Sequence, residues 1–255
     1  MKATYFLSDI HFADPHAESG LTARAFLASL EGRADTIYLV GDVFDFWLGY
    51  KHVIFSAYLP VIQLLERLVK GGTRVVLFSG NHDPDPGHFL AQSGLEIWEN
   101  GREIELDGQR VWLEHGDLID PRGWVHRLTC RIARSPIFRR LARRVHPDTA
   151  WRVARLYAKK EEDYSQPLPA GLITDYFPDK IRAGYETVVI GHYHRAVHHV
   201  IQGPTAPCAL FVLGDWVKQF TFLRYGSHGF ELCRYHGPSG TVKVLSRGDH
   251  GPENP

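Results

Sequence analysis

Five short clusters of histidine, aspartate and asparagine recur along this chain, and each directly follows an apolar, β-prone segment. Imidazole nitrogens, carboxylates and an amide oxygen are ligands that suit Mn²⁺, Fe²⁺ or Zn²⁺ better than Ca²⁺, and no thiolate is among them. The residue types therefore predict a metal site built from segments that lie far apart in the sequence. In chain order the clusters are Asp9-x-His11, Gly41-Asp42-x-x-Asp45, Gly80-Asn81-His82-Asp83, His115-Gly116-Asp117 and Gly191-His192-x-His194.

The apolar segments that precede the clusters predict the strands that bring them together. Helix patterns at residues 20–31 and 54–70 separate the first three strands, and the second pattern ends at Gly71-Gly72. This β-α-β-α-β order predicts a right-handed, largely parallel sheet. Such sheets hold ligands outside the carboxyl ends of their strands, so we expect all five clusters at one edge. The five strand segments are residues 3–7, 36–40, 74–78, 109–114 and 187–190.

The second half of the chain has a different pattern. Asp107-Gly108 lies between two apolar segments and predicts a hairpin. Residues 173–183 predict a helix, and short strands follow to residue 245. We therefore expect a single domain over residues 1–246, with a helical insertion over residues 120–165 and a disordered tail over residues 247–255.

Composition excludes several classes of protein. The 255 residues are 44% hydrophobic and 23% charged, which excludes global disorder. No apolar run is long enough to span a membrane, and Asp9 comes too early for the apolar region of a signal peptide. The three cysteines are scattered without a C-x-x-C pair, which excludes a disulfide framework. These features together predict a protein of the reducing cytosol.

Any one of the five clusters is ordinary by itself, because Gly-Asp-x-x-Asp alone is usually a turn. All five, in order and each after a strand, resemble the calcineurin-like metallophosphoesterases over residues 1–200. This resemblance implies a four-layer α-β-β-α sandwich with mixed sheets and a two-metal centre, which holds Mn²⁺ most often and Fe or Zn in some members. It implies that one metal takes Asp9, His11 and His194, that the other takes Asn81, His115 and His192, and that Asp42 bridges both.

Two such metals suit the hydrolysis of a phosphoester. They hold the attacking and leaving oxygens of an in-line displacement and lower the pKa of a bridging water. His82 is not needed as a ligand, so it can donate to the phosphoryl oxygens or protonate the leaving group. Asp83 is then expected to fix the tautomer of His82. Asp45 either supports the metal ligands from outside or caps the turn that it begins.

The predicted insertion is strongly basic. Residues 122–160 carry twelve Arg or Lys and one acid, which gives a net charge of +11 in a chain of formal net charge zero. We expect basic amphipathic helices over residues 123–144 and 149–160, with Trp124 and Trp151 among their apolar residues. Such helices suit an anionic membrane surface, and basic charge near the metals suits a diphosphate or a nucleotide. Alternatively the arginines form a solvated face over a core, or they follow a nucleic-acid backbone. No recognised nucleic-acid motif is present, so no nucleic acid is expected as a partner.

The length, the early Asp-x-His and the basic helical lid between the fourth and fifth clusters resemble the UDP-2,3-diacylglucosamine pyrophosphohydrolases of lipid A biosynthesis. The resemblance implies attack of water on the α-phosphorus of UDP-2,3-diacylglucosamine, which gives UMP and 2,3-diacylglucosamine 1-phosphate. The lid would hold the acyl chains, and the protein would lie in the cytoplasm, peripheral on the inner membrane.

This chain departs from that subfamily at the third cluster, where its best-known members have Gly-Asn-Arg-Asp and this chain has His82. Asn81, Asp120 and Trp124 lie near the positions of substrate contacts in those relatives. Two alternatives therefore stay open, namely a soluble metallophosphoesterase that acts on nucleotides or other phosphodiesters, and a non-catalytic scaffold. No obligate protein partner is evident from the sequence.

Overall fold

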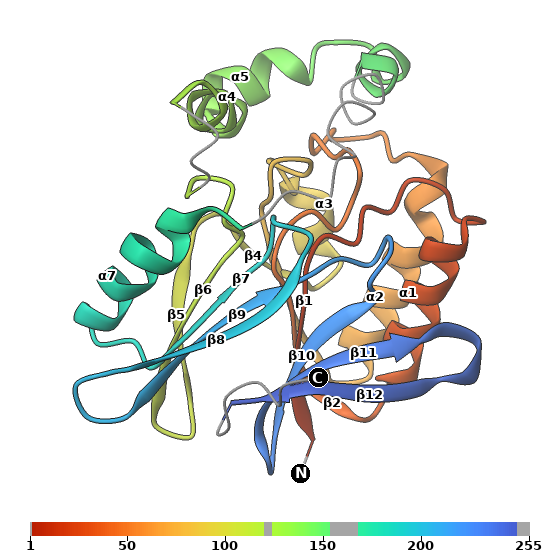
Figure 1. Ribbon diagram of the computed structural model, residues 1–255. Coiled ribbons are helices and arrows are strands. Elements are labelled where there is room, and N and C mark those ends of the chain that lie inside the picture. The colour runs from red at the N-terminus through yellow and green to blue at the C-terminus, as the bar shows by residue number, and fades with distance from the viewer. Residues whose placement is uncertain (1, 120–123, 154–167, 249–255) are drawn as a thin grey trace.

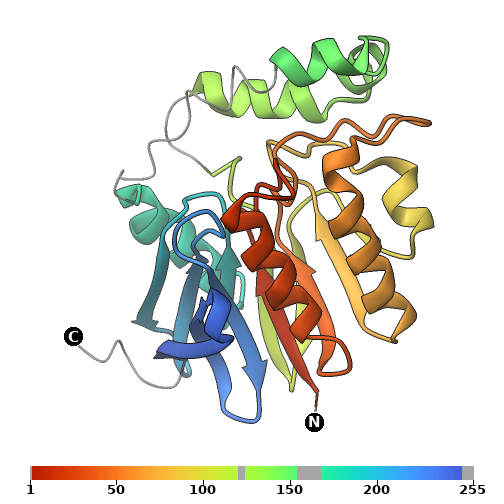
Figure 2. The same cartoon turned by 90° about the vertical axis from the view of Figure 1, so that its right-hand side faces the viewer.

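The structure is a computed structural model that describes residues 2–119, 124–153 and 168–248. Two β-sheets pack face to face, and helices cover the outer face of each (Figure 1). The described part of the insertion lies across one end of this sandwich, beyond the carboxyl ends of β1, β2 and β3 (Figures 1 and 2). The layers form the four-layer α-β-β-α arrangement that the resemblance to the calcineurin-like metallophosphoesterases implies.

The larger sheet has seven strands in the order β12-β11-β10-β1-β2-β3-β4. Strands β1 to β4 are parallel, while β10, β11 and β12 continue the sheet in antiparallel pairs. Its strands are β1 (Ala3–Leu7), β2 (Ala34–Leu39), β3 (Arg74–Phe78), β4 (Glu96–Trp98), β10 (Thr221–Gly226), β11 (Gly229–His236) and β12 (Thr241–Arg247).

The smaller sheet has five strands in the order β5-β6-β7-β9-β8. Its three inner strands are parallel, and both edge strands are antiparallel to their neighbours. The single edge expected for the five clusters is therefore wrong, because three clusters follow strands of the larger sheet and two follow strands of the smaller one. The strands are β5 (Arg102–Leu106), β6 (Gln109–Glu114), β7 (Thr187–Ile190), β8 (Ala196–Gln202) and β9 (Pro207–Leu213).

Alternation of side chains along the central strands fills two cores at once. In β1, Phe6 faces the other sheet, whereas Leu7 faces the helices, and both are fully buried. In the smaller sheet Phe211 of β9 faces the sheet interface, and Leu210 faces α7. Because both faces are covered, these strands are continuous apolar runs, and that is why the sequence identified them.

Helices α1 (Glu18–Ser29) and α2 (Leu59–Lys70) cover the larger sheet, and α7 (Phe177–Arg182) covers the smaller one. Short elements complete the layers. They are the 3₁₀ turns Ser56–Tyr58 and Gly237–Ser239, helix α3 (Gly87–Gln92) and a π-helical turn, Leu172–Tyr176, directly before α7.

The described part of the insertion is helical, and it breaks where the sequence pattern did not predict a break. Helix α4 (Trp124–Arg134) and helix α5 (Pro136–Ala142) divide the expected helix 123–144 at Ser135. The Ser135 hydroxyl accepts a hydrogen bond from the Phe138 amide, and Pro136 begins the next helix. Residues 147–153 are helical again, and the rest of the expected helix 149–160 lies outside the described residues.

The chain end differs slightly from the expected boundary at residue 246. Strand β12 runs to Arg247, and the rest of the expected tail from residue 249 lies outside the described residues. Among the described helices, none has the length and apolar character needed to cross a membrane.

The burial of His198 in β8 should make the stability of the protein depend on pH. Its ring stacks on Phe211 with centroids 4.4 Å apart, and neither ring nitrogen has a hydrogen-bond partner among the described residues. Burial, helped by the nearby His199, lowers the pKa of His198 to about 4. The folded state therefore favours the neutral ring, so stability is complete above the unfolded pKa of about 6.5 and falls as the pH drops toward 4.

We expect His198→Phe to remove this loss. Between pH 7 and pH 5 the wild type should lose about 1 kcal/mol more of its free energy of unfolding than the variant, after allowance for the partial exposure of the ring. Urea unfolding of both proteins at the two pH values measures this difference. An equal change with pH in both proteins would show that His198 titrates normally.

Candidate metal centre

Backbone strain is concentrated at the predicted metal ligands. Seven non-glycine residues in the described part of the chain have positive φ, and five of them are predicted ligands. Each such residue costs on the order of 1–3 kcal/mol and persists only where its surroundings hold it. The strain therefore marks the strand ends as a functional site. The five residues are Asp9 (φ 55°), His11 (50°), Asp42 (52°), His192 (69°) and His194 (50°).

Asp9, His11 and His194 form the first group of potential ligands. The Nε2 atoms of His11 and His194 lie 3.2 Å apart, and Asp9 Oδ1 lies 3.4 Å from His194 Nε2. Asp9 Oδ2 accepts the backbone N–H of His192 at 2.8 Å, whereas Asp9 Oδ1 is buried and accepts no hydrogen bond from the described residues. A buried carboxylate oxygen left unpaired among converging imidazole nitrogens fits a cation shared by all three groups.

Asp42, His115 and His192 form the second group, with ligand atoms within 4.8 Å of one another. His115 Nε2 lies 3.2 Å from Asp42 Oδ2 and 3.1 Å from Asn81 Oδ1. The other ring nitrogen, Nδ1, lies 2.9 Å from the Val40 carbonyl, which fixes its proton there and leaves the Nε2 lone pair for a metal. Asn81 thus lies beside the group, as expected for a fourth ligand.

Asp42 also reaches the first group, because its Oδ2 lies 3.9 Å from His11 Nε2. It belongs to two of the three potential ligand groups in the described part of the chain. This central position is the one that a bridging ligand requires. All seven residues predicted as ligands therefore converge on one end of the sandwich.

The charges of this cluster explain why it suits cations. Burial raises the pKa of Asp9 to about 6. Burial opposes charge on His115, but the carboxylates of Asp42, Asp9 and Asp117 together outweigh it, with Asp42 contributing most, and raise the His115 pKa to about 10. Burial and the neighbouring His11 lower the pKa of His194. Without metal, protons must compensate the buried carboxylates, and divalent cations would take that place.

Two glycines make this close approach possible. Gly41 has φ of +85°, and a Cβ there would overlap the His115 ring. A Cβ on Gly80 would overlap the Asp42 carboxylate. These glycines let the second, third and fourth clusters pack directly against one another.

Asp83 does not make the contact that the sequence predicted for it. Its carboxylate accepts four backbone N–H groups at 2.8–3.3 Å, so it holds the second and third clusters together and does not fix the tautomer of His82. Burial raises its pKa, with a further contribution from the Asp42 charge. The four donors are the amides of Gly80, Asp42, Val43 and Phe44.

Asp45 takes the place that was expected of Asp83. His82 Nδ1 lies 3.0 Å from the backbone carbonyl of Asp45 and 3.9 Å from its carboxylate. The same carboxylate lies 3.8 Å from His11 Nδ1, so Asp45 borders a predicted ligand and the predicted proton donor. The His82 backbone N–H donates to Asp42 Oδ1 at 2.8 Å, which ties the third cluster to the predicted bridge.

A sixth strand end supports the fifth cluster, and the sequence analysis missed it. Asp215 follows β9, and its carboxylate accepts the amides of Val217 and Lys218 and a bond from the Gln219 side chain. Gln219 also donates to the His194 carbonyl. The signal was available, because Gly214-Asp215 follows a buried strand just as Gly41-Asp42 does.

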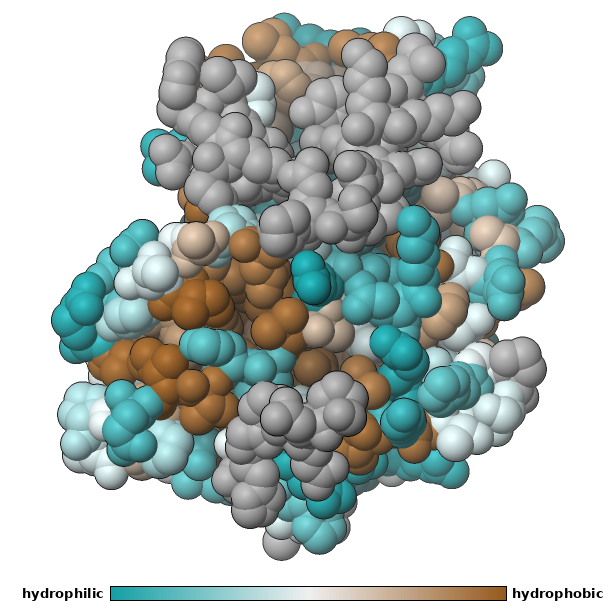
Figure 3. Space-filling view, viewed as in Figure 1, coloured by the Kyte–Doolittle hydropathy of each residue, from teal (hydrophilic) through white to brown (hydrophobic). Residues whose placement is uncertain are grey.

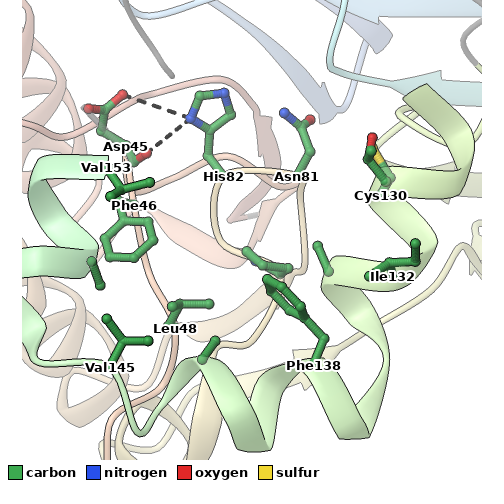
Figure 4. Close-up of a pocket in the computed structure, with 15 residues that line it drawn as sticks. Asp45, Phe46, Leu48, Asn81, His82, Cys130, Ile132, Phe138, Val145 and Val153 are labelled. Carbon is green, nitrogen blue, oxygen red and sulfur yellow. Dashed lines mark hydrogen bonds and ion pairs between the residues drawn. The ribbon is translucent and has the colours of Figure 1, made fainter. Parts of the chain in front are cut away.

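An apolar pocket of about 570 Å³ opens beside the third cluster (Figure 4). Asn81, His82 and Asp45 lie at one end of it, and apolar side chains of the insertion and of the segment after β2 form the rest. Of the predicted substrate contacts, Asn81 is at the pocket, while Asp120 and the side chain of Trp124 lie outside the described residues. Other lining residues include Phe46, Leu48, Ile132, Phe138, Val145 and Val153.

Family comparison agrees with the fold and the clusters. A profile of the calcineurin-like phosphoesterases matches residues 4–196. The chain therefore belongs to this family and is a metal-dependent phosphoesterase. Such an activity needs metal ions, and the groups of potential ligands above are candidate positions for them.

Curated relatives narrow the resemblance. The chain is 31% identical over 239 residues to a UDP-2,3-diacylglucosamine hydrolase of Pseudomonas paraeruginosa, which covers 88% of this chain and 95% of the relative. It is 29% identical over 249 residues to an enzyme of the same name from Pseudomonas syringae pv. syringae, over 94% of this chain and 98% of the relative.

Solved structures share the fold. GAP50, described as the anchor in the inner membrane complex of Plasmodium, matches with a TM-score of 0.50 and 14% identity, over 99% of this chain and 90% of that one. A Vps29 double mutant from Entamoeba histolytica matches with a TM-score of 0.48 and 14% identity, over 98% of this chain and 99% of that one.

Proposed function

We propose that this protein hydrolyses UDP-2,3-diacylglucosamine to UMP and 2,3-diacylglucosamine 1-phosphate. One observation carries the proposal: the apolar pocket opens at Asn81 and His82, directly beside the candidate metal centre. A substrate that joins a diphosphate to fatty acyl chains matches this combination, and a plain nucleotide would leave the pocket unused. The names of the curated relatives support the same substrate.

Side chains of the five clusters would hold two divalent ions, with Mn²⁺ as the proposed metal and Fe or Zn as the alternatives. Asp9, His11 and His194 would hold one ion, and Asn81, His115 and His192 would hold the other. Asp42 would contact both ions. When bound, such ions would supply an activated water for attack on the α-phosphorus and would neutralise charge on the phosphoryl oxygens.

His82 would supply the proton transfer. The Asp45 carbonyl accepts the Nδ1 proton, so Nε2 would be the atom that gives a proton to a phosphoryl oxygen or to the leaving phosphate when the ring is doubly protonated. The backbone bond from His82 to Asp42 keeps the ring beside the predicted bridge. In this proposal an imidazole fills the position that an arginine has in the best-known relatives, and Asp83 acts by holding the loop in place.

The outer surface of the insertion supports a place at an anionic membrane. Both apolar and hydrophilic residues are visible at that end of the molecule (Figure 3). Eleven large hydrophobic residues are recorded as exposed in the described part of the chain, and seven belong to the insertion. Exposed arginines accompany them, which suits a peripheral protein on the cytoplasmic face of the inner membrane. The seven are Leu128, Ile132, Ile137, Phe138, Leu141, Val145 and Val153, of which Leu128, Ile137 and Leu141 lie outside the lining of the apolar pocket.

Filling the pocket should separate the lipid substrate from a small one. Ala133 lines the pocket, so Ala133→Trp should lower kcat/KM for UDP-2,3-diacylglucosamine about 30-fold, as expected when two or three methylenes lose their burial. Turnover of bis(p-nitrophenyl) phosphate should stay within about twofold, because that diester has no chain to bury. Steady-state kinetics on both substrates measure the difference.

Ile137→Trp is the matched control for this prediction. Ile137 is 75% exposed, so the same bulk there does not enter the pocket, and both activities should be kept. Equal kcat/KM for the lipid substrate in Ala133→Trp and in the wild type would place the acyl chains elsewhere.

The proposed function is tested by UMP release from UDP-2,3-diacylglucosamine with Mn²⁺ and mild detergent, beside bis(p-nitrophenyl) phosphate. Rapid release of UMP supports the assignment. Turnover of the generic diester alone would keep the phosphoesterase chemistry, discard the lipid substrate and favour nucleotides or other phosphodiesters.

A further inference from the structure

Arg134, the last residue of α4, reaches from the insertion into the body of the protein. A single nitrogen, Nη2, donates to the Ser79 carbonyl at 3.0 Å and to Asp117 Oδ1 at 2.9 Å. The Arg134 side chain is 12% exposed, and that of Asp117 is 2% exposed. The contact is therefore a buried, charge-assisted pair that also bonds to the backbone.

Both acceptors belong to loops of the candidate metal centre. Ser79 directly precedes Gly80-Asn81, and Asp117 directly follows His115-Gly116. Asn81 Oδ1 and His115 Nε2, which these two loops carry, lie 3.1 Å apart. One arginine nitrogen thus bridges the two loops whose side chains would share one metal ion.

The energetics favour a geometric role for this pair. Burying an ion pair costs desolvation that its attraction often does not recover, so such a pair is weak evidence for stability. Asp117 Oδ2 and Arg134 Nε are buried and have no hydrogen-bond partner among the described residues, which makes the burial more costly. The pair instead fixes the distance between the two loops that carry Asn81 and His115.

Arg134 directly follows the α4 residues that form one wall of the apolar pocket. Four residues of α4 line the pocket, and among them Ile132 and Ala133 lie two and one residues before Arg134. A shift of α4 away from the body would move the pocket wall and the Arg134 bridge together.

We propose that Arg134 is a positioning residue that couples the helical insertion to the metal centre. It holds the Asn81 and His115 loops at the spacing that one metal ion needs, so metal affinity depends on a docked α4. This inference rests on the assignment of Asn81 and His115 as metal ligands in the proposed function. Because coupling is reciprocal, metal binding should favour the docked insertion in turn.

A second ion pair of the insertion supplies a matched control. Arg139 of α5 lies 2.9 Å from Glu99 and is as deeply buried as Arg134. Glu99 follows β4 and belongs to none of the five clusters. Loss of this pair removes one tie between the insertion and the body but leaves the metal loops untouched.

The test is Mn²⁺ binding to the purified full chain, followed by the electron paramagnetic resonance signal of free Mn²⁺. Wild-type protein should bind two Mn²⁺. In Arg134→Gln one of the two sites should weaken by about 10–100-fold, the range seen when a partner that orients a ligand is lost. Arg139→Gln should bind both ions within about twofold of the wild type.

Asp117→Asn should weaken the same site, and the double variant should be no weaker than Arg134→Gln, because the two residues act as one unit. If Arg134→Gln does not fold, Arg134→Lys against Arg139→Lys decides. The lysine side chain is one bond shorter than that of arginine, so its ammonium should not reach both acceptors of Nη2, and only Arg134→Lys should lose Mn²⁺ affinity.

Wild-type affinity for both ions in Arg134→Gln would overturn the inference and leave the proposed metal centre intact. An equal loss in Arg139→Gln would also overturn it, because docking in general would then be responsible. A wild-type protein that binds no Mn²⁺ would overturn both the inference and the metal assignment beneath it.

Discussion

Asp42→Ala is expected to lower kcat at least about 1000-fold for both UDP-2,3-diacylglucosamine and bis(p-nitrophenyl) phosphate. Asp42 lies 3.2 Å from His115 and 3.9 Å from His11, one in each proposed metal group. Removal of its carboxylate takes a ligand from both ions and leaves His115 without its buried counter-charge. Initial rates at saturating Mn²⁺ measure the loss.

Asp148→Ala is the control for this variant, because the Asp148 side chain is 80% exposed on the insertion. Its activity should equal that of the wild type. If Asp42→Ala kept even a tenth of wild-type turnover on either substrate, the two-metal account of this site would be wrong.

Asp83→Ala is expected to lower the free energy of unfolding by about 3–5 kcal/mol in metal-free protein, because up to four buried N–H groups lose their acceptor. The four bonds come from Gly80 and from the Asp42–Phe44 segment, so the second and third clusters should separate. Guanidinium or urea unfolding with a chelator present isolates this effect from metal binding.

Asp83→Asn is the matched variant. Its amide keeps one accepting oxygen and turns the other into a donor that faces backbone N–H groups, so it should also destabilise the protein. Any loss of activity should follow the weakened tie between the second and third clusters, because Asp83 does not touch the His82 ring. A free energy of unfolding of Asp83→Ala within 1 kcal/mol of the wild-type value would contradict the structural role of Asp83.

The strands and ligands could be read from the sequence for a clear physical reason. β1, β2, β3 and β7 are buried on both faces, so each is a continuous apolar run, and the polar residues after it stand out. Each ligand such as His115 follows its strand within a few residues, which makes its position a local property. The local pattern alone, however, could not assign the clusters to two sheets, because pairing between distant strands decides that.

Roles that depend on distant backbone atoms could not be read in this way. Asp83 lies next to His82 in sequence, yet three of its four partners are amides some 40 positions away, and the tautomer partner of His82 is the carbonyl of Asp45. The bond from Arg134 to Ser79 spans 55 positions, and its charge looks like that of the exposed arginines around it. Only the folded chain separates a buried positioning arginine from a solvated one.

Hydrolysis of UDP-2,3-diacylglucosamine in H₂¹⁸O, followed by mass spectrometry of both products, tests the central claim most directly. Attack by water on the α-phosphorus beside Asp42 puts one ¹⁸O into UMP and none into 2,3-diacylglucosamine 1-phosphate. Label in the lipid phosphate, or the absence of UMP among the products, would contradict the account.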